Sequence, residues 1–292
     1  MIVTLETTGV GLNLGITGIA FDGLGNLYLA QFDDDRIYKY SASGKLLAQW
    51  GGHGSGAGQL EAPDKLAFDA VGNLYVTEVG SGSAGANSRI QKFSATGVPL
   101  AQWGEFGSAP GQFDTPIGIA VDRQGDIYVA DAGNHRIQKL SPEGQPLAQW
   151  HTVGSGRGET TEVGYDVALD ASGNVYVSNA HPFSTGNDHI QKFSASGALL
   201  ATWGGTGKGP GKFSNPTGLT VDSKGDLFVV DSGNNRIQEL SPVGQFVAQW
   251  QGPFSAPANM PQPLTFTSKV ALDVQGNIYV SNGNLVMKLA RG

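Results

Sequence analysis

The chain has 292 residues, a net charge of −7, a pI of about 5.1, 44 glycines and no cysteine. The acidic balance disfavours a nucleic-acid partner, which usually needs a basic face, and the lack of cysteine excludes disulfides and thiolate metal sites. No apolar run has the length of a membrane-spanning helix, so we expect no membrane partner either.

The first residues, MIVTLETTG, alternate between apolar and polar like a β-strand and do not resemble a signal peptide. We therefore expect a soluble chain. Low charge and the absence of cysteine favour an extracytoplasmic or secreted protein whose leader has already been removed.

One phrase recurs six times along the chain. The copies are GIAFDGLGNLYLA (18–30), KLAFDAVGNLYVT (65–77), GIAVDRQGDIYVA (118–130), DVALDASGNVYVS (166–178), GLTVDSKGDLFVV (218–230) and KVALDVQGNIYVS (269–281). Each copy joins two alternating runs through a glycine turn, which is a hairpin signature. A third run of the RIQKF type and a fourth of the LLAQW type follow. Four strands per copy and six copies predict an all-β, six-bladed β-propeller that forms one domain, 1–292.

All five tryptophans occupy the end of the fourth run, and we expect them to pack between adjacent blades. An aromatic stripe that binds sugars is the alternative. The sixth copy stops after its third strand, and IVTLETTG supplies the missing one, with Thr8 in the tryptophan position. We therefore expect the N-terminal strand to complete the last blade and close the ring.

A longer period runs through the copies. Asp22, Asp122 and Asp222 of the odd copies are spaced by 100 residues. The residue that begins each copy also alternates: it is glycine in the odd copies and Lys65, Asp166 or Lys269 in the even ones. The second and fourth copies also have longer loops before their third strands than the third and fifth. These features predict a two-blade unit repeated three times, with pseudo-threefold symmetry.

The stretch DAGNHRIQKL (131–140) places an aspartate, a histidine and an arginine close together. Equivalent stretches replace His135 by Asp35, Ser88, Asp188 or Asn235. No acid–base chemistry tolerates these exchanges, whereas a polar cap on a turn does. The next position is arginine in four copies and histidine in one, which indicates a structural cation.

The stretch GIAVDRQGDIYVADAGNHRIQKLSPEG resembles the NHL repeat, and GQFDTPIGIAVD resembles its usual lead-in. The third and fifth copies match best, and the resemblance extends over nearly the whole chain. It implies a six-bladed propeller. For function it implies several classes, because similar propellers serve as sensor domains of bacterial kinases, as protein or RNA platforms and as amidating lyases.

Ligand sites of propellers usually lie on the loop face around the central channel. On that face we expect Lys65, Asp166 and Lys269, with Asp64 and Tyr165 one position before two of them, together with the even-copy loops and the segment 251–268. This lysine–aspartate cluster is a candidate site for an anionic or polar ligand. A mutually satisfied surface ion cluster is the alternative.

Metal chemistry is a second possibility raised by the resemblance. The amidating lyases hold zinc with channel histidines, but the five histidines here occupy loops or outer strands. Related lactonases bind calcium through oxygen ligands on the channel, and Glu78, Asn179 and Asn282 end second strands in suitable positions. Asp131 and Asp231 hold the same position in other copies, where we expect them to cap turns.

Together these observations favour a non-enzymatic NHL propeller, a rigid binding or sensor-type scaffold. We expect a monomer that binds a small molecule, a peptide or a glycan on the loop face and needs no cofactor. The alternative is a calcium-assisted lactonase- or lyase-type enzyme with its ion near Glu78, Asn179 and Asn282.

Overall fold

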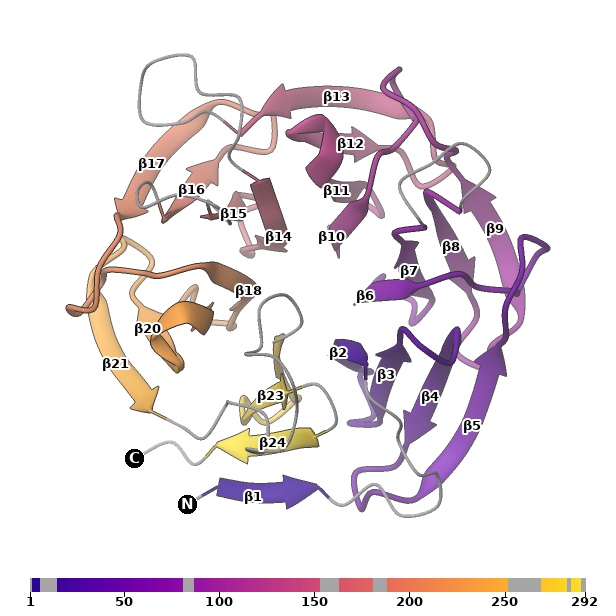
Figure 1. Ribbon diagram of the computed structural model, residues 1–292, viewed down its shortest axis with the longest axis horizontal. Coiled ribbons are helices and arrows are strands. Elements are labelled where there is room, and N and C mark those ends of the chain that lie inside the picture. The colour runs from indigo at the N-terminus through magenta and orange to yellow at the C-terminus, as the bar shows by residue number, and fades with distance from the viewer. Residues whose placement is uncertain are drawn as a thin grey trace.

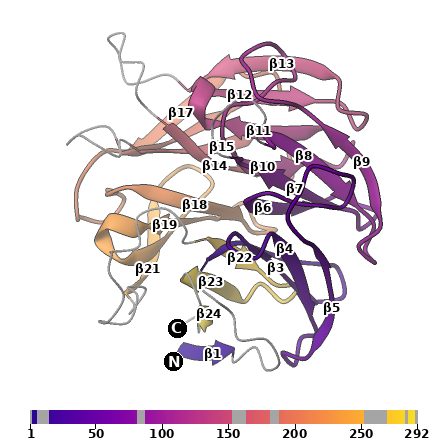
Figure 2. The same ribbon diagram turned by 45° about the vertical axis from the view of Figure 1, so that its right-hand side comes forward.

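The computed structural model describes residues 2–5, 15–80, 87–152, 163–180, 188–251, 269–282 and 285–289. Six four-stranded antiparallel sheets are arranged as blades around a central channel (Figures 1 and 2). The predicted fold class is therefore confirmed. Within the described ranges, no helix is long and apolar enough to span a bilayer.

Each blade runs from an inner strand at the channel to an outer strand at the rim. The inner strands are β2 (Ile16–Phe21), β6 (Pro63–Phe68), β10 (Pro116–Val121), β14 (Val163–Leu169), β18 (Pro216–Val221) and β22 (Val270–Leu272). The second strands are β3 (Leu27–Gln31), β7 (Leu74–Glu78), β11 (Ile127–Asp131), β15 (Val175–Ala180), β19 (Leu227–Asp231) and β23 (Ile278–Asn282). The third strands are β4 (Arg36–Tyr40), β8 (Arg89–Phe93), β12 (Arg136–Leu140), β16 (His189–Phe193), β20 (Arg236–Leu240) and β24 (Leu285–Leu289). The outer strands are β5 (Leu46–Gly51), β9 (Pro99–Trp103), β13 (Pro146–His151), β17 (Leu199–Gly204), β21 (Phe246–Gln251) and β1 (Ile2–Leu5).

The N-terminal strand closes the ring, as the sequence predicts. β1 pairs antiparallel with β24, with Ile2 opposite Leu289 and Leu5 opposite Val286, and it becomes the outer strand of the sheet β1-β24-β23-β22. Both strands lie side by side near the two ends of the chain in Figure 1. Thr8, expected in the tryptophan position, lies outside the described residues.

The hydrophobic core is divided among the interfaces between neighbouring blades. In one interface Tyr28 and Ile37 of the first blade pack with Leu66 and Leu74 of the second, and the partly buried Trp50 covers this cluster. The other four tryptophans cover equivalent clusters: Trp103, Trp150, Trp203 and Trp250. The predicted packing role of the tryptophans is confirmed. Four of the rings, all but Trp250 among the described contacts, also contact a turn glycine of the next blade where an added Cβ would collide, as at Gly244 against Trp203.

His135 is a turn residue, as predicted, but the backbone rather than a side-chain cap explains its position. A short 3₁₀ turn, η1 (Ala132–Asn134), ends at His135, which has a left-handed φ of 53°. Asp35 and Asn235 have the same φ in their own blades, the latter after η2 (Ser232–Asn234). Asparagine and aspartate tolerate this conformation best, and histidine is also enriched there.

In the second, third and fifth blades the arginine of the third strand holds the blade to the segment that enters it, and we call this arrangement the arginine clamp. Arg136 Nε donates to Asp131 Oδ2 at 2.7 Å, while its other nitrogens donate to the carbonyls of Ser108, Ala109 and Gln112. Asp131 Oδ1 in turn accepts the backbone N–H of Asp114 at 2.7 Å. The predicted structural cation is therefore confirmed, but Asp131 does more than cap a turn.

The clamp recurs around Asp231 with Arg236, and around Glu78 with Arg89. The fourth blade lacks the carboxylate–arginine pair, because Asn179 and His189 stand at the paired positions. Asn179 donates to Gln191 Oε1 at 3.1 Å, and its own Oδ1 is buried without a hydrogen-bond partner among the described residues.

Replacing Trp203 by alanine should lower the free energy of unfolding by about 3 kcal/mol, because it removes a large ring from the interface between the fourth and fifth blades. Chemical denaturation measures this change. Val71→Ala is the matched control, since Val71 is 84% exposed, and it should stay close to wild type. A Trp203→Ala chain as stable as the wild type would contradict the packing role.

Arg136→Ala should cost about 3–5 kcal/mol, because it leaves the buried Asp131 carboxylate unpaired. The double change Asp131→Asn with Arg136→His copies the fourth blade and should cost less, since no buried carboxylate is left without its partner. Denaturant midpoints of the two variants test this order. If the single variant is the more stable of the two, the clamp does not act through its charge pair.

Candidate functional site

Six positions at one end of the inner strands surround the channel, and we call them the mouth positions. They are Gly18, Lys65, Gly118, Asp166, Gly218 and Lys269. In the second, third and fifth blades the register between the first and second strands shifts around the mouth residue, for example between Pro63 and Leu66. In these three blades the mouth residue has no paired partner on the second strand.

Glycine is required in the first and third blades because the next blade crosses close by. A Cβ on Gly18 would lie 2.1 Å from the carbonyl oxygen of Asp64, and one on Gly118 would lie 2.8 Å from Cα of Asp166. Both distances are shorter than any real contact. Each of these even blades therefore places its charged mouth region directly against a glycine of the preceding blade, which explains the alternation in the sequence.

A hydroxyl on the second strand fixes each charged mouth residue. The backbone N–H of Lys65 donates to Thr77 Oγ1 at 3.0 Å, and Asp166 and Lys269 donate in the same way to Ser178 and Ser281. Thr77 also donates to the carbonyl of Ile117 in the next blade, at 2.9 Å. Sequence analysis missed these hydroxyls. The sequence contains a signal for them, because this position has a hydroxyl residue in the even copies and Ala30, Ala130 or Val230 in the odd copies.

The charged side chains meet across the ring. Lys65 Nζ forms an ion pair with Asp166 Oδ2, which joins the second blade to the fourth. Asp166 is also held by the backbone N–H groups of Val167 and Leu219, at 2.9 and 2.8 Å. Lys269 Nζ of the sixth blade lies 4.0 Å from Asp64 Oδ1 of the second.

These four side chains, the mouth cluster, are almost fully buried. The residues are between 0% and 8% exposed, so each ion has lost most of its hydration. Burial lowers the pKa of Lys65, and the nearby Lys269 adds to this effect, while Asp166 opposes it. Burial raises the pKa of Asp64, with Lys269 and Lys65 opposing. Such buried charges inside a ring differ from the solvated surface cluster considered as the alternative.

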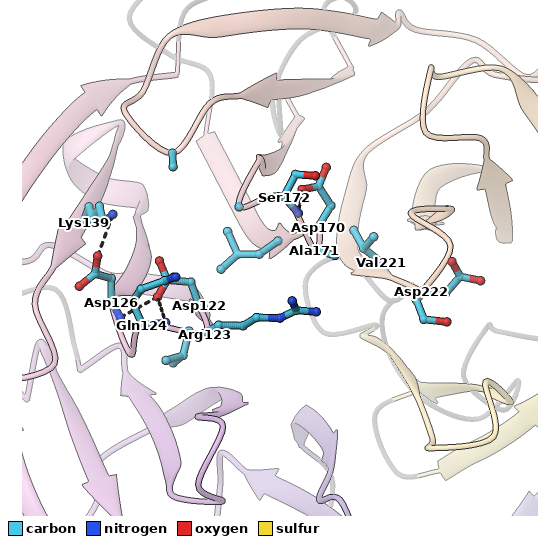
Figure 3. A pocket seen from close by; sticks show the side chains of 15 residues that line it. Asp122, Arg123, Gln124, Asp126, Lys139, Asp170, Ala171, Ser172, Val221 and Asp222 are labelled. Atoms are coloured by element: carbon cyan, nitrogen blue, oxygen red, sulfur yellow. Dashed lines mark hydrogen bonds and ion pairs between the residues drawn. The ribbon is translucent and has the colours of Figure 1, made fainter.

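Two cavities lie along the channel. One, of about 380 Å³, is lined by inner-strand residues of all six blades and has Lys65 at its end. The other, of about 630 Å³, opens among turns of the third, fourth and fifth blades (Figure 3). There Arg123 extends toward the turn that carries Asp222. Two carboxylates that line this cavity stabilise the fold: Asp122 accepts two turn N–H groups, and Asp126 forms an ion pair with Lys139.

The structure therefore brings together four of the five predicted ligand residues. The backbone of Tyr165 belongs to β14, but its side chain lies outside the described residues. The central parts of the long even-copy loops (81–86 and 181–187) and the segment 252–268 lie outside them too. The role of this face in binding stays a prediction.

The calcium alternative does not fit the described side chains. Both carboxylate oxygens of Glu78 are occupied, by Arg89, Asn87, Gln91 and the backbone N–H of Glu61. A metal would have to displace the arginine of this clamp. Asn179 contacts its own blade, and the side chain of Asn282 is not described. Among the residues that are described, no three His, Cys, Asp or Glu side chains are grouped as metal ligands would be.

Comparisons with known proteins agree with this architecture. The model of the NHL repeat matches residues 113–140 and 213–240. NHL repeat-containing protein 3 of Mus musculus is 32% identical over 102 residues, which are 33% of this chain and 28% of the mouse protein. The matched region thus spans less than a third of that relative.

Solved structures extend the likeness over the whole chain. A streptogramin B lyase superposes with a TM-score of 0.66 over 99% of this chain and 97% of its own, at 15% identity. A gluconolactonase from Xanthomonas campestris gives 0.65 over 98% and 88%, at 17% identity. At these identities the likeness concerns the fold. With the NHL matches in the third and fifth copies and the six blades observed, the chain is an NHL-repeat six-bladed β-propeller.

Proposed function

We propose that this propeller is a binding scaffold for a small polar ligand with an anionic group, which it takes at the mouth cluster. The observation that carries the proposal is the burial of two lysines in the mouth cluster, Lys65 and Lys269, of which Lys65 lines the channel cavity. Two buried ammonium groups are costly to keep dry, and a bound anion would offset part of that cost.

A small ligand is favoured over the peptide and glycan considered from the sequence. The charges lie inside the ring rather than along an exposed groove, and the channel cavity has the size of a small molecule. Lys269 Nζ can donate to a ligand, because the nearest carboxylate oxygen among the described residues, Asp64 Oδ1, lies 4.0 Å away, which is too long for a hydrogen bond.

Binding of small anions should require both lysines. A thermal-shift screen of phosphate, malonate, citrate and pyruvate, followed by calorimetry, measures affinity for the full chain. Lys269→Met should weaken binding of the best anion about tenfold or more, since a hydrogen bond to a charged group contributes roughly 1.5–3 kcal/mol. Lys208→Met, at an exposed lysine, is the control. Unchanged affinity in Lys65→Ala with Lys269→Ala would remove these residues from the site.

The same binding should strengthen as the pH falls from 8 toward 5. Burial raises the pKa of Asp64, so this carboxylate takes up its proton at a higher pH than an ordinary aspartate. Loss of its negative charge leaves Lys269 free for the anion. Calorimetry at several pH values, with Asp64→Asn as the pH-insensitive comparison, measures the effect. Weaker binding at pH 5 in the wild type would contradict this role of Asp64.

Removal of metal should leave the protein unchanged. A melt in EDTA should match a melt with added calcium, because Glu78 is committed to its arginine clamp. A calcium ion at about 100 times its dissociation constant would instead stabilise the fold by roughly 2.7 kcal/mol. A loss of melting temperature in EDTA that calcium restores would favour the lactonase-type enzyme over the binding scaffold.

A further inference from the structure

Lys65 differs from an ordinary surface lysine in three ways. Its side chain is only 6% exposed, it lines the channel cavity, and its ammonium contacts a carboxylate that is itself fixed. Asp166 is held by two backbone N–H groups from β14 and β18, so its position does not depend on the lysine. An amine next to a fixed carboxylate has a partner to which it can pass a proton.

The surroundings also favour the neutral amine more than water does. Burial and the positive charge of Lys269 act in the same direction on Lys65, and only the aspartates oppose them. A lysine made less basic by burial and by a second cation is the form that attacks carbonyl carbon atoms. The rest of the cavity wall is formed by inner-strand residues of all six blades.

We propose that the ligand of the mouth cluster is a small 2-oxo acid, whose carboxylate is held by Lys269 while Lys65 forms an imine with its carbonyl carbon. This inference rests on the proposed function, since it requires that the cluster bind an anion. It adds the class of ligand and a covalent bond to Lys65.

The chemistry balances without a further reactant. Lys65 passes one proton to Asp166, and the nitrogen lone pair attacks the carbonyl carbon, whose π electrons move to oxygen. Proton transfer from nitrogen through Asp166 to this oxygen gives a carbinolamine. The C–O bond then breaks, the oxygen leaves as water, and the nitrogen lone pair forms the C=N bond. The protonated imine carries the same charge as the original ammonium, and Asp166 is again a carboxylate.

Reductive trapping tests the proposal on the full chain. Pyruvate and sodium cyanoborohydride are added near neutral pH, and the adduct is found by intact mass and peptide mapping. We expect one reduced pyruvyl group on Lys65, formed at least tenfold faster than on exposed lysines such as Lys45 and Lys224. The N-terminal amine serves as an internal reference. The ketone 2-butanone, which lacks the carboxylate, should give no preference for Lys65.

Two variants test the roles of Lys65 as the nucleophile and of Lys269 as the residue that binds the carboxylate. Lys65→Arg keeps the charge beside Asp166 but is not a nucleophile, so it should lose the adduct. Lys269→Met should slow adduct formation about tenfold. Melting curves establish that each variant is folded, and mapping of the wild type decides the question if Lys65→Arg does not fold.

The outcomes separate the two proposals. If pyruvate shifts the melting temperature but Lys65 of the wild type is labelled no faster than exposed lysines, the imine is overturned and the binding site stands. If pyruvate and the other anions produce neither a shift nor a preferred adduct, both proposals fall. If 2-butanone labels Lys65 with the same preference as pyruvate does, the 2-oxo acid is overturned as the ligand class.

Discussion

The burial of aromatic and aliphatic side chains between neighbouring blades is the constraint on which the rest of the structure depends. No blade has a core of its own, because each sheet buries one face against the blade before it and the other against the blade after it. An open ring would leave two such faces in water. Completion of the last sheet by β1 therefore matters to every interface, and the inner strands keep their places only because the ring is closed.

The arginine clamps add a second constraint, because they fix where the second, third and fifth blades receive the chain from the preceding blade. Arg136 binds three carbonyls of the incoming segment and one carboxylate of its own blade, and Arg236 repeats the pattern. Buried ion pairs of this kind specify geometry more than they add stability. The fourth blade, with Asn179 and His189 at these positions, lacks the carboxylate–arginine pair.

The fold was predictable from the sequence because its determinants are local and repeated. Hairpin turns, tryptophan positions and the missing sixth outer strand can all be read from the aligned copies. The mouth cluster was predictable only as a set of positions on one face. The pairing of Lys65 with Asp166 depends on how far two blades lean across the channel, and a linear pattern does not contain that distance. The supporting hydroxyls, such as Thr77, appear in the sequence as an alternation of hydroxyl and apolar residues at one position of the second strand. Their role became clear only when the structure placed that position next to the mouth residue.

The β1–β24 ladder makes the ring easy to open by tension applied at its two ends. Ile2 is opposite Leu289, so the two ends of this sheet emerge side by side at the same end of the ladder. Tension applied to both ends would open the pairs one after another, from Ile2 toward Leu5, instead of loading them all at once in shear. The short β1–β24 ladder that closes the ring would therefore separate pair by pair. A modest pulling force at the ends would release it before any other blade is disturbed.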